Sequence, residues 1–283
     1  MDNTYLNIVS FVLTTYLYYL LLKPQLTYEK LEDVDMYQKY LIDNYAFLAV
    51  YIFIVIIIQC VVNINVINEK CGGGISDNMG YAGLVTIVPW ILIFGVLVVI
   101  LTIYPGFKSA FADVIGYYWV STSANEIITD LLINKEIDKT MPTDISPQQK
   151  QDMQNTADAI VKICGNSSVL INQMAPSNYK NFWDILIPLM KPQYRDNPNS
   201  EDLKDKKIKL FDLVVSKDNI GEGMWYLYTG LVVTSLVQLN IYSKGCVRNP
   251  KTMEAYYEKF MDAKNKAKAK ADSVATNYNN TDM

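Results

Sequence analysis

Four stretches of this 283-residue sequence contain no Asp, Glu, Lys or Arg: residues 3–22, 44–68, 78–107 and 223–243. A helix rises about 1.5 Å per residue, so it needs roughly 20 residues to cross about 30 Å of hydrocarbon, and each stretch is long enough. The two middle stretches are saturated with Ile, Val, Leu and Phe, which is rare for buried helices of soluble proteins. The sequence therefore predicts four membrane-spanning helices.

The first and last stretches each leave an alternative open. Residues 3–22 could be a signal peptide, but Asp2 stands where a basic region is expected and no small-residue cleavage site follows, so we interpret them as a retained anchor. Residues 223–243 contain Thr, Ser, Gln and Asn, which fits either a span packed against the others or a buried hairpin helix. Aromatic residues near the two ends favour the span: Trp225, Tyr226, Tyr228 and Tyr242.

These stretches divide the chain into four parts. We expect three transmembrane helices with short loops in residues 1–104, a helical membrane-proximal domain in 105–222, a fourth transmembrane helix in 223–243, and a basic, partly disordered tail in 244–283. The fold class is all-α: a multi-span membrane protein of about four transmembrane helices, with a helical aqueous domain inserted between spans three and four. Two helices of that domain are predicted. The first has start signals at Ser146, Pro147 and Gln149 and a stop signal at Gly165, and the second has Ser200 as its cap and an apolar face made by Leu203, Leu210, Phe211 and Val214.

Basic residues near the span ends give the expected orientation. Nine lysines flank the side that carries residues 23–44 and 105–222, against five basic residues on the other side, which places the long domain in the cytosol. With four spans, Cys71 and Cys246 then share the oxidising side. We expect them to form a disulfide, although free thiols remain the alternative.

The sequence offers little catalytic chemistry. It contains no histidine, which removes the commonest general base and zinc ligand, and it has no Cys-x-x-Cys motif or nucleophile elbow. The spans hold no charged residue; their interior amides are Gln59, Asn63, Asn65 and Gln238, which more often bond between helices than to a substrate. The glycines after Cys71 are typical of a hairpin turn and lack the Gly-Lys-Ser/Thr of a phosphate loop. We therefore predict that the protein is not an enzyme and uses no cofactor or metal.

Partner surfaces are predicted in three places. After the third stretch, a ring-rich segment carries Phe107, Phe111, Tyr118 and Trp119, which we expect at the membrane interface or against the domain. Lys204, Lys206, Lys207 and Lys209 form a cluster that fits a headgroup layer or a partner protein, or else a plain solvated face. In the tail, Tyr256 and Phe260 belong to an apolar stripe that fits a docking helix or a solvated one. The net charge of −4 points to no nucleic-acid partner.

Three segments resemble a family of integral membrane proteins in virions of nucleocytoplasmic large DNA viruses, the algal and giant viruses. They are "CGGGISDNMGYAGLVTIVPWILIFG", "YPGFKSAFADVIGYYWVSTSANEIITDLL" and "ICGNSSVL", and the likeness covers roughly residues 70–170. The run from Tyr104 to Phe111 is its most specific part. The resemblance carries over no catalytic residue, and the tail after Pro250 lies outside it.

The resemblance implies a structural role. The chain would be a minor capsid component in the inner viral membrane, drawn from a host internal membrane during assembly, with the lipid bilayer, the major and other minor capsid proteins, and its own copies as partners. The main alternative is an oligomeric channel or a fusion or entry component, with Gln59 and Gln238 lining its path. A cellular membrane protein encoded by an AT-rich genome is a further alternative.

Overall fold

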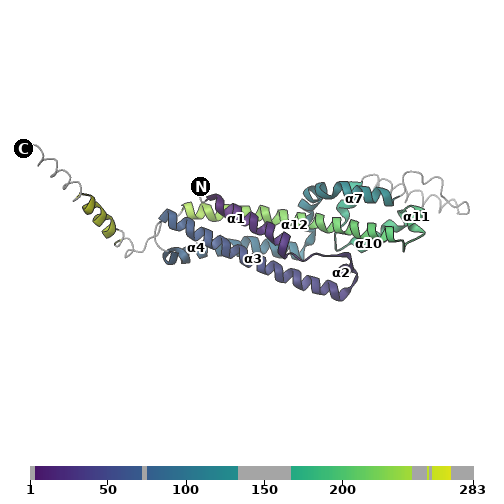
Figure 1. Cartoon of the computed structure of the whole chain (residues 1–283), viewed down its shortest axis with the longest axis horizontal. Helices are drawn as coiled ribbons and strands as arrows, with labels where there is room; N and C mark the ends of the chain where they lie inside the picture. The colour runs from purple at the N-terminus through teal and green to yellow at the C-terminus, as the bar shows by residue number, and fades with distance from the viewer. Residues whose placement is uncertain (1–3, 72–74, 133–166, 244–253, 255–256, 269–283) are drawn as a thin grey trace, which may run out of the picture.

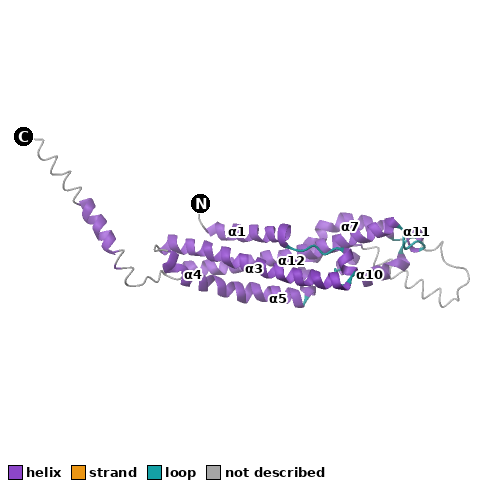
Figure 2. Ribbon diagram, turned by 60° about the horizontal axis from the view of Figure 1, so that its bottom comes forward, coloured by secondary structure: helices purple, strands orange, loops and turns teal. Residues whose placement is uncertain are grey.

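The computed structural model describes the chain except for residues 1–3, 72–74, 133–166, 244–253, 255–256 and 269–283. The described part is helical almost throughout, and its one β feature is an isolated antiparallel bridge between Leu132 and Met190. Figures 1 and 2 show an elongated bundle with the long helices side by side. The all-α prediction is confirmed. The predicted helix at residues 146–165 lies outside the described residues.

Three of the predicted spans coincide with helices that are long and apolar enough to cross a membrane: Tyr5–Leu22, Val34–Cys71 and Asn78–Ile103. The first runs through α1 (Thr4–Leu17) and a π-helical turn, η1 (Tyr18–Leu22), and the second is α3 (Val34–Cys71). The third runs through α4 (Ile75–Pro89), η2 (Trp90–Gly95) and α5 (Val96–Ile103). The π-helical register of η2 begins directly after Pro89, which has no N–H with which to continue the α-helical ladder.

Residues 223–243 belong to α12 (Glu201–Ser243), a single helix of 43 residues that is about 65 Å long at the usual rise. Its residues from 223 onward are less apolar than the three spans, and α12 is not among the helices that composition alone marks as membrane-crossing. Its polar residues there include Thr229, Thr234 and Gln238, which are buried. Its Leu231, Val232, Leu236 and Leu239 face outward. The fourth span therefore stays a prediction.

Together, α1–η1, α3, α4–η2–α5 and residues 223–243 of α12 make up what we call the membrane bundle. Its core is rich in aromatic side chains, with Trp90, Phe94 and Tyr226 almost fully buried. Phe11 of α1 packs against Trp90 with ring centroids 5.2 Å apart, and Tyr51 of α3 stacks on Tyr18 at 4.4 Å. The first helix therefore packs into this core, and its retention as an anchor stays a prediction.

After α5 the chain continues away from the membrane bundle, through η3 (Pro105–Lys108), α6 (Ser109–Phe111), η4 (Ala112–Gly116) and α7 (Tyr117–Leu131). This segment runs along α12 at unusually close range. A β-carbon at Gly116 would lie 2.5 Å from the carbonyl oxygen of Lys217, and one at Gly221 would lie 2.6 Å from Cβ of Ala112. Glycine at these two positions is what allows the two backbones to approach so closely.

A second core lies outside the membrane bundle. It is built by α7, α9 (Ser167–Gln173), α10 (Tyr179–Leu186), η6 (Ile187–Leu189), α11 (Pro192–Arg195) and the first half of α12, together with Leu26 and Tyr28, which opens α2 (Tyr28–Glu32). We call the described part of residues 105–222 the head. The predicted apolar face of α12 is buried in this core, and the Ser200 hydroxyl accepts a hydrogen bond from the N–H of Leu203 at 3.4 Å, as a helix cap does. Residues 222 and 223, where the sequence suggested a boundary, lie within the unbroken α12.

Candidate functional site at the end of the membrane bundle

The four charge-free stretches end at one level of the molecule, and charged residues follow them there. Lys23, Lys108 and Glu222 directly flank the first, third and fourth stretches, and all three line one cavity together with Asn44, the first residue of the second stretch. An antiparallel bundle brings these four positions together because alternate helices begin and end at the same face. The result is a polar layer between the membrane bundle and the head.

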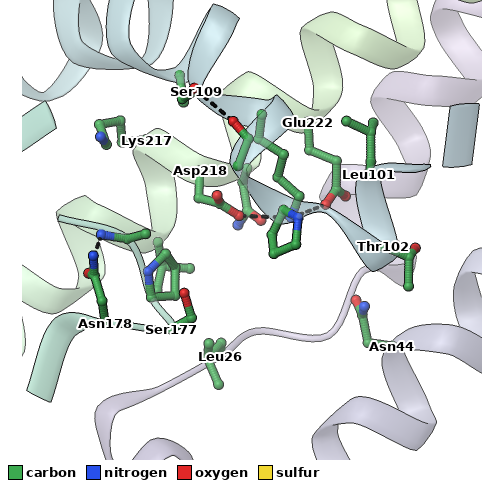
Figure 3. Close-up of a pocket in the computed structure, with 18 of the residues that line it drawn as sticks. Leu26, Asn44, Leu101, Thr102, Ser109, Ser177, Asn178, Lys217, Asp218 and Glu222 are labelled. Atoms are coloured by element: carbon green, nitrogen blue, oxygen red, sulfur yellow. Dashed lines mark hydrogen bonds and ion pairs between the residues drawn. The ribbon is translucent and has the colours of Figure 1, made fainter. Parts of the chain in front are cut away.

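Glu222 is the centre of this layer. One of its carboxylate oxygens pairs with Lys23 and accepts a hydrogen bond from the Tyr19 hydroxyl at 3.1 Å, while the other lies 2.7 Å from Nζ of Lys108. Lys108 also pairs with Asp218 at 2.9 Å (Figure 3), and Asp218 lies one helical turn before Glu222 on α12. The ion pairs therefore fasten the ends of η1 and η3 to the middle of α12.

The charges of this cluster set each other's protonation. Burial alone would raise the pKa of the Glu222 carboxyl, but the ammonium groups of Lys23 and Lys108 outweigh burial and lower the pKa to about 2. Burial opposes a charge on Lys108 too, yet the carboxylates of Glu222 and Asp218 hold its pKa above that of an ordinary lysine. Burial lowers the pKa of Lys23 against the attraction of Glu222. Glu222 and Lys108 are thus both charged at neutral pH.

A second ion pair lies one step further into the head. Nζ of Lys217 is 2.8 Å from Asp113 of η4 and donates to the backbone carbonyl of Asn172 in α9 at 3.1 Å. Only 3% of the Lys217 side chain is exposed. A buried lysine needs such partners because an unpaired charge there is costly. This pair holds three segments of the head together.

These groups surround a cavity of about 430 Å³, within the size range of small-molecule sites. Its walls come from α3, from the end of α5 with η3 and η4, from the 23–26 loop, from α12 and from the α9–α10 loop, as Figure 3 shows in part. Apolar lining is given by Leu41, Leu48 and Leu101, and aromatic lining by Tyr37, Tyr40 and Tyr45. The cavity thus has both ionic and apolar walls.

Inside the membrane bundle, Asn63 of α3 joins all four helices. Its side-chain oxygen accepts hydrogen bonds from Asn7 of α1 and Gln238 of α12, both at 3.0 Å, and its Nδ2 donates to Thr86 of α4 at 2.8 Å. Gln59 donates to the backbone carbonyl of Asn7 at 3.0 Å. The expectation that amides bond between helices is thus met at Gln59, Asn63 and Gln238, whereas Asn65 is exposed on the outer face of α3.

The four aromatic residues of the ring-rich segment lie at two different heights along α12. Phe111 packs edge-on against Trp225 at 5.0 Å, and the carbonyl of Phe107 accepts a bond from the Trp225 indole at 2.8 Å, which places both at the start of the fourth stretch. Gly116 lies opposite Lys217, and Lys217 precedes the start of the fourth stretch on α12 by about 9 Å at 1.5 Å per residue. Tyr118 and Trp119 follow Gly116 in the chain and therefore lie still further from the membrane bundle. Their side chains are 81% and 77% exposed. The interfacial role of these four residues stays a prediction.

The four lysines of the predicted cluster have different surroundings, and their docking role stays a prediction. Lys206 pairs with Asp130 and Asp202, both at 3.0 Å, and Lys207 lies over the rings of Tyr28 and Trp183. Lys209 pairs with Asp205 at 2.7 Å on the surface, and Lys204 is exposed. In the tail, residues 257–268 are helical and Phe260 is exposed, while Tyr256 lies outside the described residues.

The remaining predicted features are the disulfide and the absence of a metal site. Cys71 takes part in a disulfide and Cys60 is a free thiol. Cys246 lies outside the described residues, so the Cys71–Cys246 pairing stays a prediction. Within the described ranges, no three His, Cys, Asp or Glu side chains come together as metal ligands would.

No protein-family model, no curated protein and no solved structure matches this chain. Function must therefore be argued from the residues themselves. The polar layer was not anticipated from the sequence, although the signal was present: a charged residue stands directly beside each of the four charge-free stretches at this end, namely Lys23, Asp43, Lys108 and Glu222, and these residues carry both signs.

Proposed function

We propose that this chain is a structural membrane protein of a virion, a minor capsid component that anchors the inner viral membrane to the overlying capsid shell. The motif resemblance suggests the setting, and the membrane-sized helices support the membrane half of the role. In this proposal residues 223–243 are the fourth span, and the head faces the cytosol during assembly and the shell afterwards.

One observation carries the anchoring role: α12 contributes to both cores without a break. Leu210, Phe211 and Val214 are buried in the head, and Tyr226, Val233 and Val237 are buried in the membrane bundle. The ion pairs of Glu222 and Lys217 clamp this helix where the two cores meet. A load applied to the head is therefore passed to the membrane bundle through a continuous helix rather than through a flexible linker.

The channel alternative has less support. It needs Gln59 and Gln238 to face a water-filled path, whereas both are buried and hydrogen-bonded to neighbouring helices. Planar-bilayer conductance that disappears in a Gln59→Leu, Gln238→Leu double variant would nevertheless favour the channel over the anchor.

The decisive experiment is lysine cross-linking with mass spectrometry on detergent-free membranes or particles from the source. We expect links from head lysines such as Lys204 and Lys209, which are exposed, to an abundant coat protein. Lys70, which bonds to the last backbone carbonyls of α12 at the opposite end of the bundle, serves as the internal control and should not link to that coat protein. Links confined to the chain and its own copies would contradict the anchoring role.

A further inference from the structure

The cavity in the polar layer lies where the apolar stretches end, so in a membrane it would stand at the headgroup level. Its walls change in character across that level. Leu48 and Leu101 belong to charge-free stretches, whereas Lys23, Lys108 and Glu222 lie just beyond them. Tyr45 of α3 and Thr102 of α5 both line the cavity and are both exposed, so we place the mouth of the cavity between these two helices. An amphiphile entering from the bilayer would therefore meet apolar walls at its tail end and ionic walls at its head.

The charges that line the cavity balance each other. Lys23, Lys108 and Lys217 are matched by Asp113, Asp218 and Glu222, and each lysine is paired with at least one of these carboxylates. A site with balanced charges does not attract an anion strongly by its net field. It suits a molecule that itself carries one charge of each sign.

Two buried hydrogen-bond acceptors in the lining have no partner among the residues that the structure describes: the side-chain oxygens of Asn44 and Asn172. A buried polar atom without a partner is costly, so a ligand that brings donors to it gains free energy. Lys23, which also lines the cavity, donates one of its three N–H groups to Glu222 within the described chain. The cavity is therefore lined by unpartnered acceptors on α3 and on α9 and by the ammonium donors of Lys23.

We propose that this cavity binds the headgroup of a phospholipid that carries a primary ammonium group, of the phosphatidylethanolamine type. Its ammonium donates to the oxygen of Asn44 on α3, the helix that also carries Tyr37 and Tyr40, and its phosphate accepts from Lys23. The acyl chains leave between α3 and α5 into the bilayer. This inference rests on the membrane placement in the proposed function, but not on the anchoring role.

Phosphatidylcholine is the matched ligand for the test, because it has the same net charge and the same phosphate but no N–H donor. The full-length chain is reconstituted into vesicles of equal phosphatidylethanolamine and phosphatidylcholine, and the lipids retained by the released protein are counted by native mass spectrometry. We expect retained phosphatidylethanolamine to exceed phosphatidylcholine at least fivefold. Equal retention, or a preference for phosphatidylcholine through the aromatic walls alone, would overturn the proposal.

Variants on one helix make the test specific. Asn44→Leu should bring the ratio close to one, whereas Asn44→Asp, which keeps acceptor oxygens at that position, should preserve the preference even if the leucine variant fails to fold. Asn65→Leu is the matched control, because Asn65 is exposed on the same helix, 21 residues away, and should leave the ratio unchanged. If Asn44→Leu folds and leaves the ratio of retained phosphatidylethanolamine to phosphatidylcholine unchanged, the assignment of Asn44 to the headgroup site is wrong. Failure of the unaltered chain to enter vesicles would overturn the membrane placement as well, which distinguishes the two claims.

Discussion

At the scale of single residues, Asn63 shows how much a few polar side chains contribute inside an apolar bundle. Its amide is 1% exposed and satisfies partners on three other helices at once. The amides of a sequence reveal that such a network can exist, because polar groups in apolar spans need partners. The choice of Asn63 over Asn65 depends on which face of α3 meets the other helices, and α3 is too uniformly apolar for its sequence to show that face.

Replacing Asn63 with leucine should destabilise the membrane bundle by about 1–3 kcal/mol, because it leaves the groups of Asn7, Thr86 and Gln238 without their common partner. The measurement is reversible unfolding in mixed micelles by circular dichroism. Asn65→Leu, which replaces an exposed amide on the same helix, should change the stability by less than about 0.5 kcal/mol. Equal effects of the two substitutions would contradict the network.

Glu222 predicts a dependence of stability on pH. Its folded pKa of about 2 lies below the ordinary value of 4.5, so the charged carboxylate stabilises the fold fully above about pH 4.5, and this contribution is lost as the pH falls to about 2. A shift of this size corresponds to about 3 kcal/mol. Thermal unfolding should therefore show the native chain more stable than Glu222→Gln at pH 7, with the difference closing between pH 4.5 and pH 2. A difference that does not depend on pH would show that the carboxylate charge is not what matters.

At the scale of elements, the close contact between η4 and α12 decides how the head is joined to the long helix. Gly116 and Gly221 stand where each helix meets the backbone or the β-carbon of the other. At about 100° per residue, helical periodicity places Gly116 on the polar side of the ring-rich segment, opposite the rings. It could not identify that side as the packed one, because the small residues Ala112 and Gly116 bury little area and give no hydrophobic signal.

Gly116→Ala should therefore be costly, since the new methyl group would stand 2.5 Å from the Lys217 carbonyl oxygen and the helices must separate. We expect a loss of about 1–3 kcal/mol, which is the usual cost of overpacking. Gly83→Ala is the matched control, because nothing lies within 4 Å of a β-carbon there, and alanine is the better helix former. Unfolding midpoints of the two variants measured side by side test the contact, and equal midpoints would refute it.

At the scale of the whole molecule, the sequence predicted the helical class and three of the long apolar helices directly, because an unbroken apolar run of that length has few other structures open to it. It did not predict that the last helix belongs to both cores. The acidic and lysine-rich start of α12 differs so much in composition from its end that the two halves suggest separate elements. Continuous backbone hydrogen bonding joins the two halves, and amino-acid composition does not reveal such bonding.

The continuity of α12 gives a measurable distance. Asp205 in the head and Leu239 in the membrane bundle are both exposed and stand 34 residues apart on this helix. Spin labels attached there through unnatural amino acids should give a narrow distribution centred at about 50 Å, as expected for an unbroken helix. Ile220→Pro should broaden and shorten it, because proline interrupts the helical ladder. A broad distribution in the chain without that proline would contradict the rigid connection.

The length of α12 also makes the molecule a lever. Transmembrane helices tilt when the bilayer becomes thinner than their apolar length. Because α12 is about 65 Å long, a tilt of about 10° around its inner end moves the far end sideways by about 10 Å. If residues 223–243 cross the membrane as proposed, a change in bilayer thickness would therefore be converted into a lateral step of the head. In a layer of many copies, local thinning of the membrane would appear on the outside as a shift in spacing between neighbouring heads.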